Sequence, residues 1–96
     1  MMTENYETPP QRLKDLNGFG ERSEEILAEV GVHTVEDFMN IDPYELYALI
    51  LPMKGMGLNS IYSIIGAWEN ISWIEIKNTR KTEILLRLDD LGLAPS

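Results

Sequence analysis

The sequence predicts an all-α protein, a compact bundle of about five to six short helices. Three observations lead to this prediction. Apolar residues recur at intervals of three and four, most regularly at Leu58, Ile61, Ile65 and Trp68. Capping residues, prolines and glycines interrupt the chain at short intervals, as they do between short helices. One stretch, residues 72–76, alternates as a strand would, but the chain offers no second such stretch to pair with it.

The first half of the chain contains three predicted helices. The first begins at residues 8–10, where a threonine cap precedes two prolines, and ends at residues 17–18, an Asn-Gly pair. The second spans residues 21–30, because its acidic first turn suits the positive end of the helix dipole and a glycine follows it. Thr34, with an acidic residue three positions later, predicts the start of a third short helix.

The second half contains the remaining predicted helices. Asp42 followed by a proline is a strong start signal for the fourth helix, and the regular apolar stripe forms the fifth. Residues 72–76 are interpreted as a connector that holds Trp73 against the core. Asn78 or Thr79 then caps the last helix.

Length and charge limit the domain organisation and the partners. The chain of 96 residues is long enough for one core, and we expect a polar arm at 1–8, one helical domain at 9–92 and a short tail at 93–96. The formal net charge is −8, and residues 1–40 hold nine acidic and three basic residues, a net charge of −6. Such a surface repels phosphate backbones unless its cations are clustered.

Composition also argues against an enzyme. There is no cysteine and a single histidine, His33, so thiolate metal sites, cysteine nucleophiles and histidine triads are not expected. We therefore expect no cofactor, no metal and no catalytic residue. No apolar stretch approaches the roughly 20 residues of a membrane span, and the polar N-terminus carries no targeting signal. The expected location is the cytoplasm.

One motif has a known mechanism. Two leucines lead into Gly18-Phe19-Gly20 and then into a helix, which is the pattern of a helix-hairpin-helix. Glycines permit the turn, and the central side chain fills the space between the helices. In versions that bind nucleic acid, the turn contacts a phosphate, supported by a cation. Here Arg22 and Ser23 lie among three glutamates, so the predicted hairpin is a credible scaffold and a poor phosphate clamp.

The stretch 18–38 resembles the opening of the TfoX (Sxy) C-terminal domain, with a glycine hairpin, an Arg-Ser pair, an acidic helix and a Gly-Val-x-Thr helix start. The later block, Leu58-Asn59, Tyr62, Gly66-Ala67 and then Trp73, is similar to the second block of that family. The resemblance covers about residues 11–91. It implies a compact helical domain related to helix-hairpin-helix folds, usually carried behind a separate α+β domain that we do not expect in this chain.

The same resemblance implies a role in regulating natural competence, because full-length relatives act as transcriptional co-activators with the cyclic-AMP receptor protein. It implies no catalytic residue. Glu21 stands where relatives often have a basic residue or proline, which weakens a DNA-contacting role.

Two further sets of residues are candidate surfaces. Tyr44 and Tyr47 lie three residues apart on one helix, and with Met53 and Met56 they form a candidate protein interface or homodimer contact. The alternative is that the tyrosines complete the edge of the core. The second set is the basic group for a nucleic-acid role, which comprises Lys77, Arg80, Lys81 and Arg87, together with Arg22 of the hairpin.

The sequence therefore favours a non-enzymatic regulatory or protein-interaction module with a protein partner. The alternative is a DNA-binding helix-hairpin-helix protein that uses the hairpin and the basic group. An acidic chain makes the second function the less favoured one.

Overall fold

Five α-helices and one short 3-10 helix form the described part of the chain, which comprises residues 6, 10–53 and 55–95 of this computed structural model. The elements are η1 (Leu13–Asp15), α1 (Glu21–Glu29), α2 (Val35–Asn40), α3 (Pro43–Ile50), α4 (Asn59–Glu69) and α5 (Trp73–Asp90). No strand occurs within these ranges, and the predicted all-α class is confirmed.

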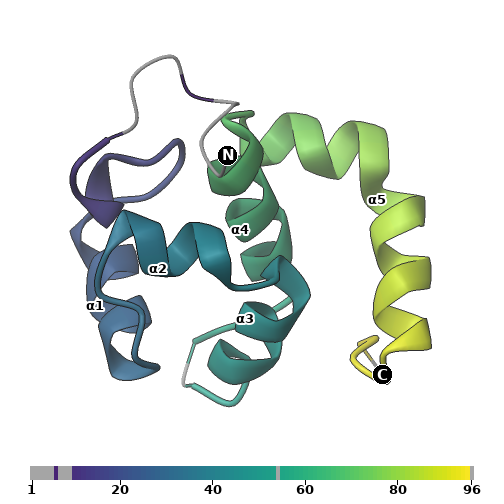
Figure 1. The fold of residues 1–96 in the computed structure, drawn as a ribbon. Coiled ribbons are helices and arrows are strands. Elements are labelled where there is room, and N and C mark those ends of the chain that lie inside the picture. Colours follow the sequence, from purple (N-terminus) through teal and green to yellow (C-terminus); the bar gives the residue numbers. More distant parts are fainter. Residues whose placement is uncertain (1–5, 7–9, 54, 96) are drawn as a thin grey trace.

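Helix α4 forms the centre of the fold. Figure 1 shows α4 between α1 and α2 on one side and α5 on the other, with α3 packed below it. Because α4 has neighbours on both sides, most of its circumference is buried. Its buried residues are Ile61, Tyr62, Ile64, Ile65, Gly66 and Ala67.

The predicted starts of α2 and α3 are confirmed by their caps. The Thr34 hydroxyl oxygen accepts a hydrogen bond from the Asp37 N–H at 3.0 Å. The Asp42 carboxylate accepts from the N–H groups of Tyr44 and Glu45 at 3.0 and 3.2 Å. Each cap occupies N–H groups that the first helical turn leaves without an intrahelical partner.

The predicted first helix is much shorter than expected. Residues 8 and 9 of its predicted start lie outside the described residues, and only η1 is helical, with Arg12 as its N-terminal flank. Leu16 already has extended backbone angles, φ −68° and ψ 152°. One turn is enough to bury Leu13 and Leu16, which are 1% and 2% exposed, so packing requires no longer helix.

Tyr6 lies within residues 1–8, the segment predicted as a polar arm. It is the described residue of that segment, and it lies in the hydrophobic core. Its hydroxyl donates a hydrogen bond to the Ala67 carbonyl of α4 and accepts one from the Asn17 N–H at 3.2 Å. The Tyr6 side chain therefore bridges Asn17 and the central helix α4.

The start of α5 was predicted incorrectly. Residues 73–76 are the first turn of α5 and not a connector, because the Ser72 hydroxyl oxygen caps the helix by accepting from the Ile74 N–H at 3.3 Å. The expected contact of Trp73 with the core is present, and Ile76 lies one turn later at 1% exposed. This three-residue spacing is helical, although the local alternation resembles a strand.

Helix α5 bends partway along its length (Figure 1). The Thr79 hydroxyl donates to the Glu75 carbonyl at 2.7 Å, a side-chain bond to the preceding turn that is associated with helix bending. Asn78 and Thr79, which were predicted as caps, are thus interior positions of the helix. The bend lets Ile84 and Leu88, both 0% exposed, reach the core from the second half of α5.

The turn from α4 to α5 depends on Gly66. A Cβ atom at this position would lie 2.5 Å from the Ile71 carbonyl oxygen and 3.2 Å from the Trp73 nitrogen. The Ile71 N–H donates to the Gly66 carbonyl at 2.8 Å, which closes the turn. Only a residue without a side chain permits this approach of backbone to backbone.

Candidate functional site: the hairpin pocket

The segment Gly18–Gly20 forms the predicted tight turn. Gly18 has φ +81°, a conformation that other residues rarely adopt, and the Phe19 N–H donates to the Leu16 carbonyl at 2.9 Å. The Phe19 ring packs edge-on against Phe38 of α2, with centroids 5.4 Å apart. The turn is therefore as expected, but the element before it is a single 3-10 turn, and a complete helix-hairpin-helix is not confirmed.

The N–H group of Gly20 is already used within the chain. It donates to the Ser23 hydroxyl oxygen at 3.3 Å, which closes the N-terminal turn of α1. In the phosphate-binding form of this motif the glycine N–H groups face the ligand. Ser23 occupies one of these donors, which agrees with the expectation that the hairpin is a poor phosphate clamp.

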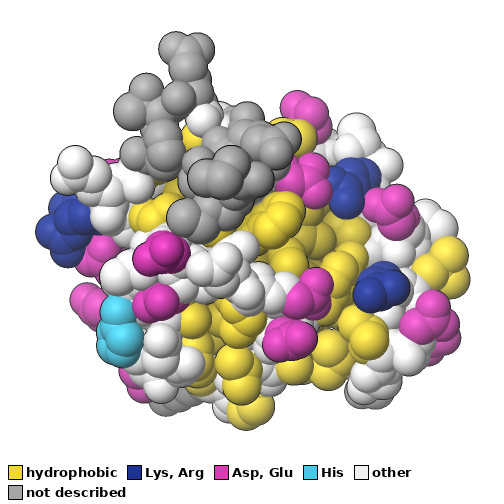
Figure 2. Space-filling model, viewed as in Figure 1, with side chains coloured by type: hydrophobic (Ala, Val, Ile, Leu, Met, Phe, Trp, Pro, Cys, Tyr) yellow, Lys and Arg dark blue, Asp and Glu magenta, His cyan; other side chains and the backbone are white. Residues whose placement is uncertain are grey.

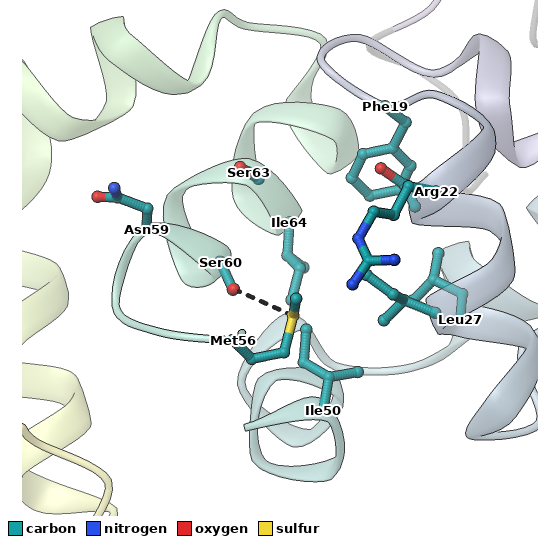
Figure 3. Close-up of a pocket in the computed structure, with 11 residues that line it drawn as sticks. Phe19, Arg22, Leu27, Ile50, Met56, Asn59, Ser60, Ser63 and Ile64 are labelled. Atoms are coloured by element: carbon teal, nitrogen blue, oxygen red, sulfur yellow. Dashed lines mark hydrogen bonds between the residues drawn. The ribbon is translucent and has the colours of Figure 1, made fainter. Parts of the chain in front are cut away.

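A pocket of about 320 Å³ lies between the hairpin, α1, the end of α3 and the start of α4 (Figure 3). We call it the hairpin pocket. Its walls are mainly apolar, and it is open to solvent along one side. It is lined by Phe19, Arg22, Ser23, Ile26, Leu27, Ile50, Met56, Asn59, Ser60, Ser63 and Ile64.

The polar groups of the hairpin pocket lie at its rim. The Ser60 hydroxyl donates to the Met56 sulfur at 3.6 Å. Figure 3 shows the Arg22 side chain extending from α1 toward the side of the pocket formed by Met56 and Ile64. No ion pair joins Arg22 to a carboxylate of the described residues. A mostly apolar cavity with a few polar groups at its edge is the usual form of a binding site.

This pocket brings together residues from two different predictions. Phe19, Arg22 and Ser23 were predicted as hairpin residues, and Met56 was predicted as part of an interface. Sequence reasoning missed Ile26 and the serines of α4. The spacing of Ser60 and Ser63 relative to Ile64 was the available signal, because it places small polar residues beside an apolar stripe.

The predicted tyrosine and methionine interface does not form one surface. Tyr47 is 2% exposed and belongs to the core, so its prediction as an interface residue is wrong. Leu49 of the same helix is instead 49% exposed. Tyr44 lines a different cavity from Met53 and Met56.

Two arginines of the predicted basic group, Arg80 and Arg87, are engaged within the molecule. Arg80 donates two hydrogen bonds to Glu69 at 2.7 and 2.8 Å and one to Glu83 at 2.9 Å. The Arg87 guanidinium lies over the Tyr44 ring, 5.7 Å from its centroid. Lys77 and Lys81 are on the same helix, half-buried and exposed respectively, and neither lies with Arg22 in a pocket.

A second cavity lies between α3 and the C-terminal half of α5. Figure 2 shows apolar side chains in this cavity and acidic side chains beside it. Its volume is about 500 Å³, and it is lined by Asp42, Tyr44, Glu45, Ala48, Arg87, Leu91 and Leu93. Burial raises the pKa of the Tyr44 hydroxyl, so this group is a neutral hydrogen-bonding group at neutral pH.

The carboxylates around α1 differ in their surroundings. Glu24 forms an ion pair with Arg12 at 2.5 Å, and this hydrogen bond lowers the pKa of Glu24. Glu21, Glu25 and Glu29 are exposed. Within the described ranges, no three side chains of the metal-binding types come together, and none of the helices has the length and apolar character needed to cross a bilayer.

A family comparison accounts for most of the chain. Residues 9–88 match the family model described as the TfoX C-terminal domain. Comparison with curated proteins gave no match, and comparison with solved structures gave none. The matched segment contains the glycine turn, the residues that line the hairpin pocket, and Gly66 at the turn from α4 to α5. The chain belongs to the TfoX C-terminal domain family.

Proposed function

We propose that this domain is a non-enzymatic, cytoplasmic interaction module that regulates a partner protein, and that the hairpin pocket is its binding site. Regulation of competence and transcription, which the family resemblance implies, is the setting of this proposal. The observation that carries it is the apolar pocket beside the hairpin, because an open apolar cavity gains free energy when a partner side chain displaces its water.

The volume of the hairpin pocket agrees with this use. At about 320 Å³ the pocket is large enough to hold several water molecules. Phe19, Ile26 and Met56 provide an apolar wall on which these molecules make few hydrogen bonds. One or two large apolar side chains of a partner would replace them favourably.

Site-specific crosslinking tests this function. A photo-crosslinking phenylalanine analogue would replace Asn59 at the rim of the pocket, and in a matched protein it would replace Lys81, which lines none of the three cavities described. We expect a discrete protein adduct from position 59, identified by mass spectrometry, and none from position 81. An adduct of twice the chain mass would identify a second copy as the partner.

The pocket itself is tested by filling it. Ser63→Trp places a large ring in the cavity and should abolish the adduct from position 59. Thermal unfolding would show that the variant is folded, and Met56→Ser provides a second variant outside the helices. Equal adducts from positions 59 and 81, or an adduct that survives both pocket variants, would overturn the proposal.

A further inference from the structure

A second, acidic hollow lies along α1 beside the hairpin pocket. This hollow, which we call the acidic groove, is lined by Arg22, Glu25, Ile26, Glu29 and Met53. It shares Arg22 and Ile26 with the hairpin pocket. The two cavities are therefore neighbours, one with mainly apolar walls and the other with two carboxylates in its lining.

The charge of the acidic groove is not balanced within the described structure. Glu25 and Glu29 lie four residues apart on α1, so their carboxylates project from one face of the helix and repel each other. Neither forms an ion pair with a described cation, whereas the neighbouring Glu24 is paired with Arg12. The groove keeps two exposed carboxylates beside a single arginine.

This arrangement favours one kind of occupant. A ligand that places an apolar side chain in the hairpin pocket can extend over the neighbouring acidic groove, where lysine or arginine side chains would be attracted and carboxylates repelled. The net charge of −8 acts in the same direction over longer distances, because it raises the encounter rate with cationic partners.

We propose that the two neighbouring cavities together bind a cationic apolar peptide segment of a partner protein, with its apolar residues in the hairpin pocket and its basic residues against Glu25 and Glu29. This inference rests on the proposed function and adds the chemistry of the partner. Arg22 lines both cavities. It therefore lies where the apolar part of the bound peptide segment would meet its cationic part.

Three synthetic peptides test the inference. Each has about 12 residues, a length sufficient for three helical turns. The first carries leucines at helical spacing with lysines elsewhere, the second has the same leucines with glutamates, and the third keeps the lysines but replaces leucine with alanine. Isothermal titration calorimetry against the full chain, at low and at physiological salt, measures each affinity.

We expect the leucine–lysine peptide to bind and both other peptides to bind at least about tenfold more weakly. The double variant Glu25→Gln with Glu29→Gln should lower the affinity for the leucine–lysine peptide by about tenfold or more. It should also reduce the dependence of that affinity on salt. Asp89→Asn with Asp90→Asn is the matched control, because it removes the same charge from the end of α5 and should change affinity less than about twofold.

The outcomes separate the two proposals. If the leucine–lysine and leucine–glutamate peptides bound with equal affinity, and both lost binding to Ser63→Trp, the inferred chemistry of the partner would be overturned. The hairpin pocket would remain the binding site. Equal losses in the two charge variants would show a non-specific effect of net charge and would also overturn the inference. Absence of binding by every leucine peptide, together with no crosslink from position 59, would overturn both proposals.

Discussion

Two of the four tyrosine hydroxyls show opposite ways of burying a polar group. The Tyr6 hydroxyl donates to the Ala67 carbonyl and accepts from the Asn17 N–H. The Tyr62 side chain is 0% exposed, and its hydroxyl has no hydrogen-bond partner among the described residues. Because a buried polar group without a partner costs free energy, the same substitution should have opposite effects at these positions.

Tyr6→Phe should lower the free energy of unfolding by about 1 kcal/mol, since the Ala67 carbonyl and the Asn17 N–H then lose their partner. Tyr62→Phe should leave that free energy unchanged or raise it by about 1 kcal/mol. Urea denaturation of both variants measures the difference. A greater loss in the Tyr62 variant would contradict the hydrogen bonding described here.

At the scale of elements, the start of α5 is the clearest difference between sequence and structure. Ser72→Ala removes the cap and should lower the free energy of unfolding by about 1 kcal/mol. Asn78→Ala is the matched control, because Asn78 is exposed in the interior of α5, where alanine favours helix by a few tenths of a kcal/mol. If thermal denaturation showed a greater loss of stability in Asn78→Ala than in Ser72→Ala, the helix would start at Asn78 and the assigned cap would be wrong.

Local signals predicted the caps at Thr34 and Asp42, because a cap depends on residues within three positions of it. The same reasoning failed at Ser72, where the alternation of five residues resembles a strand and hides a helical spacing. It also failed on α3, which is apolar around most of its surface and so does not reveal which face is buried. The all-α class needed only the periodicity.

The candidate site was only partly predictable for a different reason. The glycine turn and Phe19 are local, and the sequence identified them. The hairpin pocket requires α1 and the start of α4 to lie side by side, which depends on long-range packing. The contact of Tyr6 with α4 is also long-range, since it spans 61 positions of the chain.

At the scale of the whole molecule, the four tyrosines predict how stability depends on high pH. Burial raises the pKa of each of them, Tyr6, Tyr44, Tyr47 and Tyr62, above its ordinary value near 10. A raised pKa in the folded state contributes stability that is present below pH 10 and is lost as the pH rises through the folded values. We therefore expect cooperative alkaline unfolding.

Absorbance at 295 nm measures this prediction. In the native protein, tyrosine ionisation should occur together with the loss of helical circular dichroism, at a higher pH than in protein unfolded by guanidinium. Coincident titrations of the native and unfolded protein would contradict the buried environments of these side chains.

The distribution of charge predicts no binding of duplex DNA. Arg80 is held by Glu69 and Glu83, and Arg87 lies on Tyr44, so the positive charge that the basic group can offer to phosphates is reduced on a chain of net charge −8. At physiological salt, fluorescence anisotropy with a short duplex should show no saturable binding up to about 50 µM. Submicromolar binding that falls with salt and is lost in Arg22→Ala would instead favour the DNA-binding alternative.

The bend in α5 has a consequence for the order in which the fold opens. Its N-terminal half lies against α4, whereas its C-terminal half is held by Ile84, Leu88 and the contact of Arg87 with Tyr44. A bent helix can lose its outer half without losing the inner one, so we expect residues 81–90 to open as a separate cooperative unit. Native-state hydrogen exchange should show their amides opening at a lower free energy than those of α4. The two halves of one uninterrupted helix would then unfold separately. Opening of the outer half would take apart the cavity beside Tyr44, while the hairpin pocket would stay intact.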